Sequence, residues 1–156
     1  MKVLGRAGAR MAVLMLAAVL PACGSGDGEP TTPTTPTRTQ IGGGTFNVVG
    51  TVEAIEQGYN ADIAAGSFPI GEGGTVEILA DWTSPGNNID IFFYIGACTS
   101  EQARSNVCAI ANRTTSTTTK PERLNIIGVP AGNYSLGFAN FGPTAESGSF
   151  QVFLTR

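Results

Sequence analysis

From residue 41 onward, hydrophobic and polar residues alternate in short runs. Successive side chains of a β-strand point to opposite faces, so a period of two predicts strands with one buried face. The residues expected to face the core are Phe46, Val48 and Val52; Val76, Ile78, Ala80 and Trp82; Ile89, Ile91, Phe93 and Ile95; Leu124 and Ile126; Tyr134, Leu136 and Phe138; and Phe150, Val152 and Leu154. The pattern therefore predicts six or more strands.

The runs are separated by the turn-forming segments EGG, SPGNN, VPAGN and FGPTAESG. No run of 11 or more residues repeats with a helical period, and the best helical candidate, residues 100–106, is short. Many short strands with frequent turns are typical of an antiparallel β-sandwich. We therefore expect an all-β domain at residues 41–156, a single antiparallel β-sandwich of jelly-roll or Ig-like type.

The first 22 residues form a different pattern. Lys2, Arg6 and Arg10 precede an apolar run of about ten residues, residues 11–20. A helix needs roughly 20 apolar residues to cross a bilayer, so the run is too short to span a membrane. A positive start followed by a short apolar stretch is typical of a signal peptide, which we place at residues 1–22.

The apolar run ends in Leu20-Pro21-Ala22-Cys23, which resembles the lipobox of bacterial lipoproteins. The resemblance implies cleavage before Cys23 and attachment of fatty acyl chains to that residue, which would anchor the protein in a membrane. Gly24, in place of Asp, favours the outer membrane or cell surface. The alternative is an ordinary secretory signal that leaves Cys23 as a free thiol.

Residues 23–40 contain no large apolar side chain after Cys23, so they cannot bury enough surface to offset the entropy of ordering. Pro30, Pro33 and Pro36 recur at every third residue, which matches the turn of a polyproline II helix. This composition predicts a disordered, partly extended tether between the lipidated cysteine and the domain.

Composition and charge exclude several functions. The chain has 156 residues, a net charge of −3 and no histidine, and its Lys and Arg residues form no basic stripe. Nucleic-acid binding is therefore not expected. Lack of histidine excludes Ser-His-Asp and Cys-His catalysis and most zinc enzymes. Asp81 and Asp90 could in principle serve a carboxylate-dependent hydrolase, but we expect no enzyme and no catalytic residues.

Cys98 and Cys108 flank a polar segment of an exported chain, so a disulfide between them is expected. With Cys23 lipidated, all three cysteines are accounted for. The alternative is a redox or metal-binding pair, which the spacing does not favour because it is not CxxC.

Two candidate binding sites follow from the strand pattern. Phe92, Tyr94 and Phe153 would form an exposed aromatic platform for a sugar ring or a protein, unless loops or residues 41–65 cover them. Four oxygen-bearing side chains around a Pro-Gly turn could hold calcium, unless they bond their own backbone. These are Asp81, Asn87, Asn88 and Asp90. No other cofactor is expected.

Three strand motifs resemble the bacterial pre-peptidase C-terminal domain. Asp90-Ile91-Phe92-Phe93, Ala131-Gly132-Asn133-Tyr134 and Gly148-Ser149-Phe150 match its strand signatures, over roughly residues 73–155. That family is a small β-sandwich found beside secreted proteases, and some of its relatives bind calcium. This chain departs from it by lacking a protease and by carrying the cysteine-bracketed insertion before residues 114–119.

The sequence thus predicts a lipoprotein of the bacterial cell envelope, anchored to a membrane and displayed at the surface. We expect a non-catalytic module that binds a glycan or a protein. The alternatives are a structural or assembly component of the envelope and, least favoured, the hydrolase.

Overall fold

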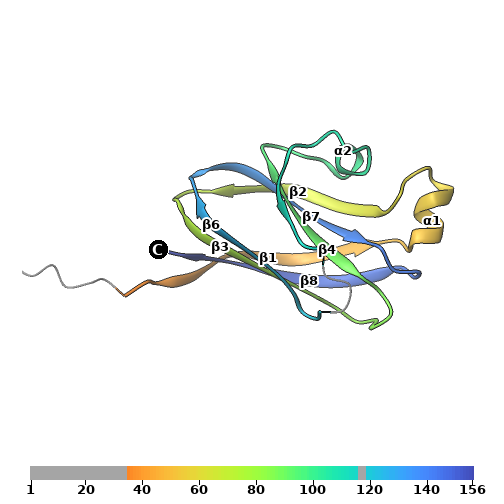
Figure 1. Ribbon diagram of the computed structural model, residues 1–156, viewed down its shortest axis with the longest axis horizontal. Helices are drawn as coiled ribbons and strands as arrows, with labels where there is room; N and C mark the ends of the chain where they lie inside the picture. The colour runs from red at the N-terminus through yellow and green to blue at the C-terminus, as the bar shows by residue number, and fades with distance from the viewer. Residues whose placement is uncertain (1–34, 116–118) are drawn as a thin grey trace, which may run out of the picture. The chain divides into compact units, whose positions relative to one another are not determined.

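The computed structural model describes residues 35–115 and 119–156. The signal peptide, Cys23 and most of the tether lie outside the described residues. Within them, eight strands form two four-stranded antiparallel sheets that face each other, with two short helices outside the sheets (Figure 1). The expected all-β sandwich is confirmed. Of the helices in this part of the chain, neither is long and apolar enough to cross a membrane.

We name the sheets after their first strands. The β1 sheet contains, in spatial order, β1 (Arg38–Val48), β8 (Glu146–Thr155), β3 (Gly74–Trp82) and β6 (Glu122–Val129). The β2 sheet contains β2 (Asp62–Ile70), β7 (Gly132–Asn140), β4 (Ile89–Ile95) and β5 (Ile110–Arg113). Strands β1, β6, β2 and β5 are therefore the edges among the described strands.

The first strand begins earlier than the hydrophobic pattern indicated. β1 starts at Arg38, whereas residues up to 40 were expected in the tether. The backbone of Thr37 also exchanges two hydrogen bonds with Arg156. Strand pairing uses backbone groups and needs no apolar side chain, so the alternating pattern missed the first three residues of the strand.

The core between the sheets contains most of the side chains that alternation assigned to it. Ile78, Ile91 and Phe93 are almost completely buried, and the rings of Phe46 and Phe138 stack with centroids 4.5 Å apart across the two sheets. Burial of these side chains from both sheets supplies most of the hydrophobic stabilisation of the fold. The period-two pattern therefore placed the inner faces correctly over most of each strand. Ile95 is an exception: it was assigned to the core, but it is the last residue of β4 and is 60% exposed.

A second, smaller cluster lies on the outer face of the β2 sheet, beneath α2 (Ser100–Arg104). This helix has a capping box, in which Thr99 and Gln102 each accept a backbone hydrogen bond from the other. A five-residue helix is not stable alone, so its packing on β2 is needed to hold it. It occupies the short helical candidate at residues 100–106.

The other helix, α1 (Thr51–Glu56), was not expected. Val52 had been assigned to a strand, but it lies on this helix and is 63% exposed. The helix begins where Thr51 donates both its backbone N–H and its hydroxyl to the carbonyl of Gly142. This contact joins residues far apart in the sequence, which explains why the local pattern did not reveal the helix.

Candidate functional site

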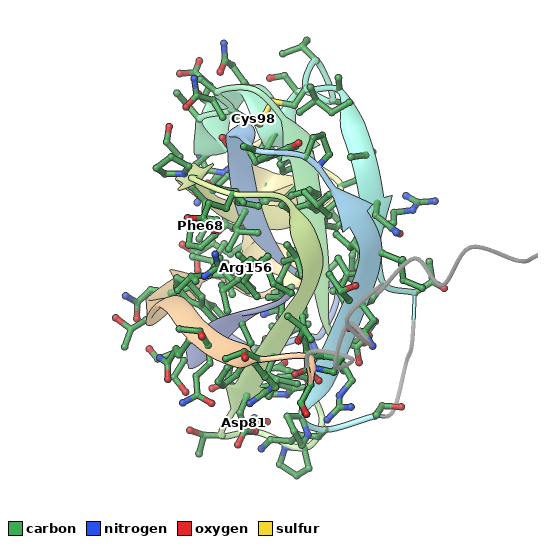
Figure 2. The ribbon with its side chains drawn as sticks, turned by 90° about the vertical axis from the view of Figure 1, so that its left-hand side faces the viewer. Phe68, Asp81, Cys98 and Arg156 are labelled. Carbon is green, nitrogen blue, oxygen red and sulfur yellow. A yellow bond between two sulfur atoms is a disulfide. The ribbon has the colours of Figure 1, made fainter. Side chains whose placement is uncertain are left out.

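The expected disulfide is present: Cys98 and Cys108 are bonded, with Cα atoms 5.9 Å apart. It closes the segment that contains α2 and holds it against the outer face of the β2 sheet. Cys98 itself is buried in the cluster beneath the helix. Figure 2 places Cys98 and Asp81 on opposite sides of the sandwich. The bridge therefore belongs to the segment, residues 98–108, that forms a cover over the outer face of the β2 sheet. It lies away from the outer face of the β1 sheet.

The aromatic platform is not formed. Phe92 and Tyr94 do point away from the inter-sheet core, but they are only 6% and 2% exposed because α2 and the disulfide segment cover them. Burial raises the pKa of the Tyr94 hydroxyl to about 12. Phe153 lies on β8 in the other sheet and cannot join them. The alternative reading, in which other parts of the chain cover the aromatic residues, is correct for this pair.

Phe153 instead packs against Arg38, the first residue of β1. The guanidinium of Arg38 lies 3.3 Å from the centre of the Phe153 ring, and its Nη2 is 2.6 Å from the Glu77 carboxylate. Arg123 approaches the same carboxylate at 3.2 Å. Together these contacts hold the Arg38 side chain against the outer face of the sheet and so fix the start of β1.

The four candidate calcium ligands are not assembled into a cation site. The Asn87 side chain is buried and already bonded: its Nδ2 donates to Glu146, and its Oδ1 accepts from Thr144. Asp81 lies on β3 and Asp90 on β4, in different sheets. Within the described residues, no group of three or more His, Cys, Asp or Glu side chains could hold a metal ion.

Asp81 and Asp90 also fail to form the carboxylate pair that a hydrolase would need. Each alternates with core residues on its own strand, so the two side chains point away from the core on opposite outer faces. Asp90 is buried, and its Oδ1 has no hydrogen-bond partner. Burial, and then the nearby Glu122, raise the pKa of Asp90 to about 6, while Arg113 opposes the shift.

Three hollows meet along β1 and the adjoining strands. The outer groove, about 820 Å³, crosses the outer face of the β1 sheet; a second hollow of about 510 Å³ continues it along the same face. The aromatic cleft, about 370 Å³, opens between β1 and β2. The outer groove is lined by Gln40, Gly42, Gly43, Gly44, Leu79, Asp81, Pro121, Ser149, Phe150 and Gln151. The hollow that continues it is lined by Thr45, Asn47, Asp81, Trp82, Thr83, Ser147, Gly148 and Ser149.

The aromatic cleft has a different character from the grooves. Its walls are mainly the rings of Phe46, Phe68, Phe138 and Phe150, with Ser67 and other small polar residues at the rim. Phe150 lines both the cleft and the outer groove. In Figure 2 this flank of the sandwich, marked by Phe68, lies at the left. A polar surface and an apolar opening thus lie on either side of one edge strand.

Three consecutive glycines in β1 make this arrangement possible. A Cβ at Gly42 would overlap the Phe68 ring, and a Cβ at Gly44 would lie 3.1 Å from Cε1 of Phe150. Without side chains, the strand lets both rings lie directly against its backbone. Sequence reasoning missed this site, although glycine inside a strand often marks the close approach of a ligand or of another part of the chain.

The lining of the outer groove is mostly uncharged. Gln40, Gln151 and Ser149 present amide and hydroxyl groups, and Asp81 is its charged member. The nearest cation, Nζ of Lys120, is 3.7 Å from the Asp81 carboxylate. This lining offers several hydrogen-bond donors and acceptors but no concentrated charge, which suits a neutral polar ligand.

Comparison with known proteins adds limited information. No family model matches the chain, and no curated protein matches it by sequence. A Yersinia pseudotuberculosis-derived mitogen is similar in structure, with 10% identity, a TM-score of 0.49 and coverage of 77% of this chain and 87% of the mitogen. PliG of Aeromonas hydrophila, a periplasmic inhibitor of g-type lysozyme, has 11% identity, a TM-score of 0.42 and coverage of 76% and 86%. No functional conclusion follows from likenesses at this level.

Proposed function

We propose that this protein is a lipid-anchored lipoprotein of the bacterial cell envelope whose β-sandwich binds another molecule without transforming it. The observation that carries the proposal is the convergence of three hollows on residues 40–47 of β1, the stretch that contains its three consecutive glycines. Binding sites are usually concave, with a few polar groups that orient the ligand. The outer groove and the aromatic cleft have both properties.

The fixed position of the start of β1 supports the proposal that the domain is held on a tether. Arg38, the first residue of β1, is held by Glu77 and Phe153, so the chain that precedes it leaves the sandwich at a defined point. The C-terminus lies at the same end (Figure 1). The proposed site begins two residues later on the same strand, at Gln40. An anchor at Cys23 would therefore hold the ligand close to the end of the tether.

The chemistry of the hollows supports binding over catalysis. General acid–base catalysis needs a titratable group at the reacting atoms, and usually a second group to complete the proton transfer. The outer groove offers the carboxylate of Asp81 together with amides and hydroxyls. Such groups can recognise a ligand by hydrogen bonds, but they do not form a nucleophile–base pair.

A second candidate, an assembly role in the envelope, is favoured by a separate apolar surface. Ile95, Ile110 and Ile127 are exposed, and Ile127 is 87% exposed. Ile95 and Ile127 line a further hollow of about 380 Å³ between the two sheets at the β5–β6 side. Exposed apolar side chains that gather in this way often mark protein contacts. Photocrosslinking from residue 127 in intact cells would test this role.

The binding proposal is tested with detergent-solubilised, full-length mature protein against polysaccharides and envelope extracts. Ser149→Trp places a large side chain in the outer groove, and Asn125→Trp places one at an exposed position on β6 outside it. We expect captured material to be lost with the first variant and kept with the second. Capture that is unaffected by Ser149→Trp would refute binding at this groove.

The anchor requires a separate test. Cys23→Ser removes the acceptor thiol, so the protein should move from the membrane to the soluble fraction of the cells. Mass spectrometry of the wild-type protein should then show fatty acyl chains on an N-terminal Cys23. Full membrane retention of the variant would contradict the lipid anchor but would not affect the groove experiment.

A further inference from the structure

We infer that the ligand is an uncharged, extended segment of a partner protein that pairs with β1 and becomes the outer strand of the β1 sheet. This inference rests on the proposed binding function and names the class of its ligand. It is carried by three features of β1: an exposed backbone edge, the lack of the protection seen at other edges, and a side-chain cleft along that edge.

The backbone of β1 is accessible along its free edge. β1 pairs with β8 on one side, and none of the described strands pairs with its other side. Gly43 and Gly44 are exposed, and for glycine exposure means accessible backbone. The Gly42 carbonyl accepts a 3.3 Å hydrogen bond from the exposed Gln40 side chain, which a peptide N–H could replace. An edge of this kind can extend the sheet by another strand.

The other edge strands are protected from such pairing. On β2, the hydroxyl of Ser100 bonds both the N–H and the carbonyl of Ala65, and Pro69 has no N–H. β5 has only four residues. β6 carries the charged Arg123 and is followed by Pro130. Proteins commonly use short strands, charges and prolines to prevent association at edges, yet residues 39–48 of β1 contain neither charge nor proline.

The aromatic cleft opens along the same edge. Side chains of an added strand would alternate between the outer face and the space between the sheets. Those pointing inward would enter the cleft between Phe46, Phe68, Phe138 and Phe150. Those pointing outward would lie beside Thr45 and Asn47, which line the cleft rim and the outer hollow. The geometry therefore selects apolar residues at every second position, separated by small polar ones.

The absence of charge in this region also restricts the ligand. No charged residue occurs between residues 39 and 52, so a charge on an inward-pointing side chain would lose its hydration without gaining a partner. A neutral glycan would suit the outer groove but would leave the aromatic cleft unused. A second copy of the chain would present a β1 whose Phe46 and Val48 are already buried in its own core.

The test begins with selection of 12-residue peptides from a random display library on the full-length mature protein in detergent. Affinity is then measured by fluorescence anisotropy for the selected peptide and for a series in which each amide in turn carries an N-methyl group. A strand pairs through alternate N–H groups, so alternate positions should lose about tenfold in affinity, with small changes between them. Uniform sensitivity, or none, would overturn strand addition.

Two variants place the peptide on β1. Gly66→Trp, which places a side chain in the aromatic cleft because Gly66 pairs with the inward-facing Leu136, should weaken the selected peptide at least tenfold, whereas Asn125→Trp on the distant β6 should not. Peptide affinity that is unchanged in Gly66→Trp would overturn the placement in the cleft. Because the N-methyl series uses the wild-type protein, the inference stays testable if a variant fails to fold.

The outcomes separate this inference from the proposed function. If a neutral polysaccharide binds, is lost with Ser149→Trp, and no peptide is selected, the module binds a ligand but strand addition is wrong. If sedimentation shows a dimer that Gly66→Trp dissociates, and no peptide is selected, the edge binds a second copy and the inference is again wrong. If no captured ligand responds to either variant, the proposed function itself fails.

Discussion

The buried carboxylate of Glu146 lies 3.0 Å from Nδ2 of Asn87 and accepts its hydrogen bond. The same carboxylate also accepts backbone hydrogen bonds from Thr83, Ser84 and Ser147. Asn87 in turn accepts two hydrogen bonds from Thr144. This network joins the β3–β4 loop to the start of β8. Asn87, a candidate calcium ligand by sequence, therefore has a structural role: it links these two segments.

Glu146→Gln should destabilise the protein at pH 7. Burial opposes ionisation of Glu146 and is the largest single effect, but the hydrogen bonds from Asn87 and three backbone N–H groups together lower the pKa of its carboxyl below 4.5. Glutamine keeps the size but gives up charge-assisted hydrogen bonds, so we expect a loss of about 1–3 kcal/mol by urea unfolding.

The same pKa direction predicts how this contribution changes with pH. The folded-state pKa is lower than the unfolded one, so the stabilisation is present above about pH 4.5 and is lost as pH falls through the lowered folded value. The difference between wild type and Glu146→Gln should therefore shrink on acidification. A difference that grows in acid would contradict the assigned role.

Calcium should leave the stability unchanged. Asn87 is occupied by Glu146 and Thr144, and Asp81 and Asp90 lie in different sheets, so no set of oxygen ligands is preassembled. Thermal unfolding with EDTA and with millimolar calcium should give the same midpoint. A site with a Kd about 100-fold below the calcium concentration would stabilise by roughly 2.7 kcal/mol, and a shift of that size would refute this expectation.

Removal of the Cys98–Cys108 bridge should destabilise the cover over the β2 sheet. For the short loop that it closes, replacement of both cysteines by serine should cost about 2–3 kcal/mol. The bridge holds α2 over Phe92 and Tyr94. Amides of α2 should therefore exchange hydrogen faster in the variant than in the wild-type protein, with a smaller change in β4. Cys23→Ser, which leaves the bridge intact, is the control. Equal stability with and without the bridge would show that packing alone holds the cover.

Gly42→Ala should destabilise the domain through a single clash. The added methyl group would overlap the Phe68 ring, which must then move away from the strand. We expect a loss of about 1–3 kcal/mol, partly restored by Phe68→Leu in the double variant. Gly66→Ala is the matched control, because a Cβ there meets nothing within 4 Å. Equal effects of the two alanines would exclude the steric explanation.

Asp90→Asn should stabilise the protein above pH 6. Burial and Glu122 raise the folded pKa of Asp90 from 3.8 to about 6, so its charged form is disfavoured in the folded state. Above pH 6 this costs stability, and the cost disappears as pH falls below 3.8, where the side chain is neutral in both states. After allowance for solvent screening, the gain at pH 7.5 should be roughly 1–2 kcal/mol.

The check is urea unfolding of wild type and Asp90→Asn at pH 7.5 and at pH 3.5. The stability difference should be present at the higher pH and absent at the lower one. Asp81→Asn, at an exposed position on the other sheet, is the control and should show little difference at either pH. Destabilisation by Asp90→Asn at pH 7.5 would indicate that the charged carboxylate has a stabilising role.

Prediction from the sequence succeeded where local periodicity carries the information. Alternation assigned Ile78, Ile91 and Phe93 to the inner faces, and the cysteine spacing indicated the bridge. Alternation did not predict β2, whose residues 64–67 are small and show no clear alternation. The lipobox, the tether and the resemblance to the pre-peptidase domain stay predictions, since the described residues and the comparisons do not test them.

For the candidate sites, the amino-acid pattern showed that Phe92 and Tyr94 point away from the core, because neighbouring side chains on a strand must face opposite sides. Tertiary structure decided that α2 would cover them, that Phe153 would lie on the other sheet, and that the glycines of β1 would border an open edge. Side-chain direction depends on backbone geometry within a few residues. Exposure depends on which distant segments pack together, and that requires the folded chain.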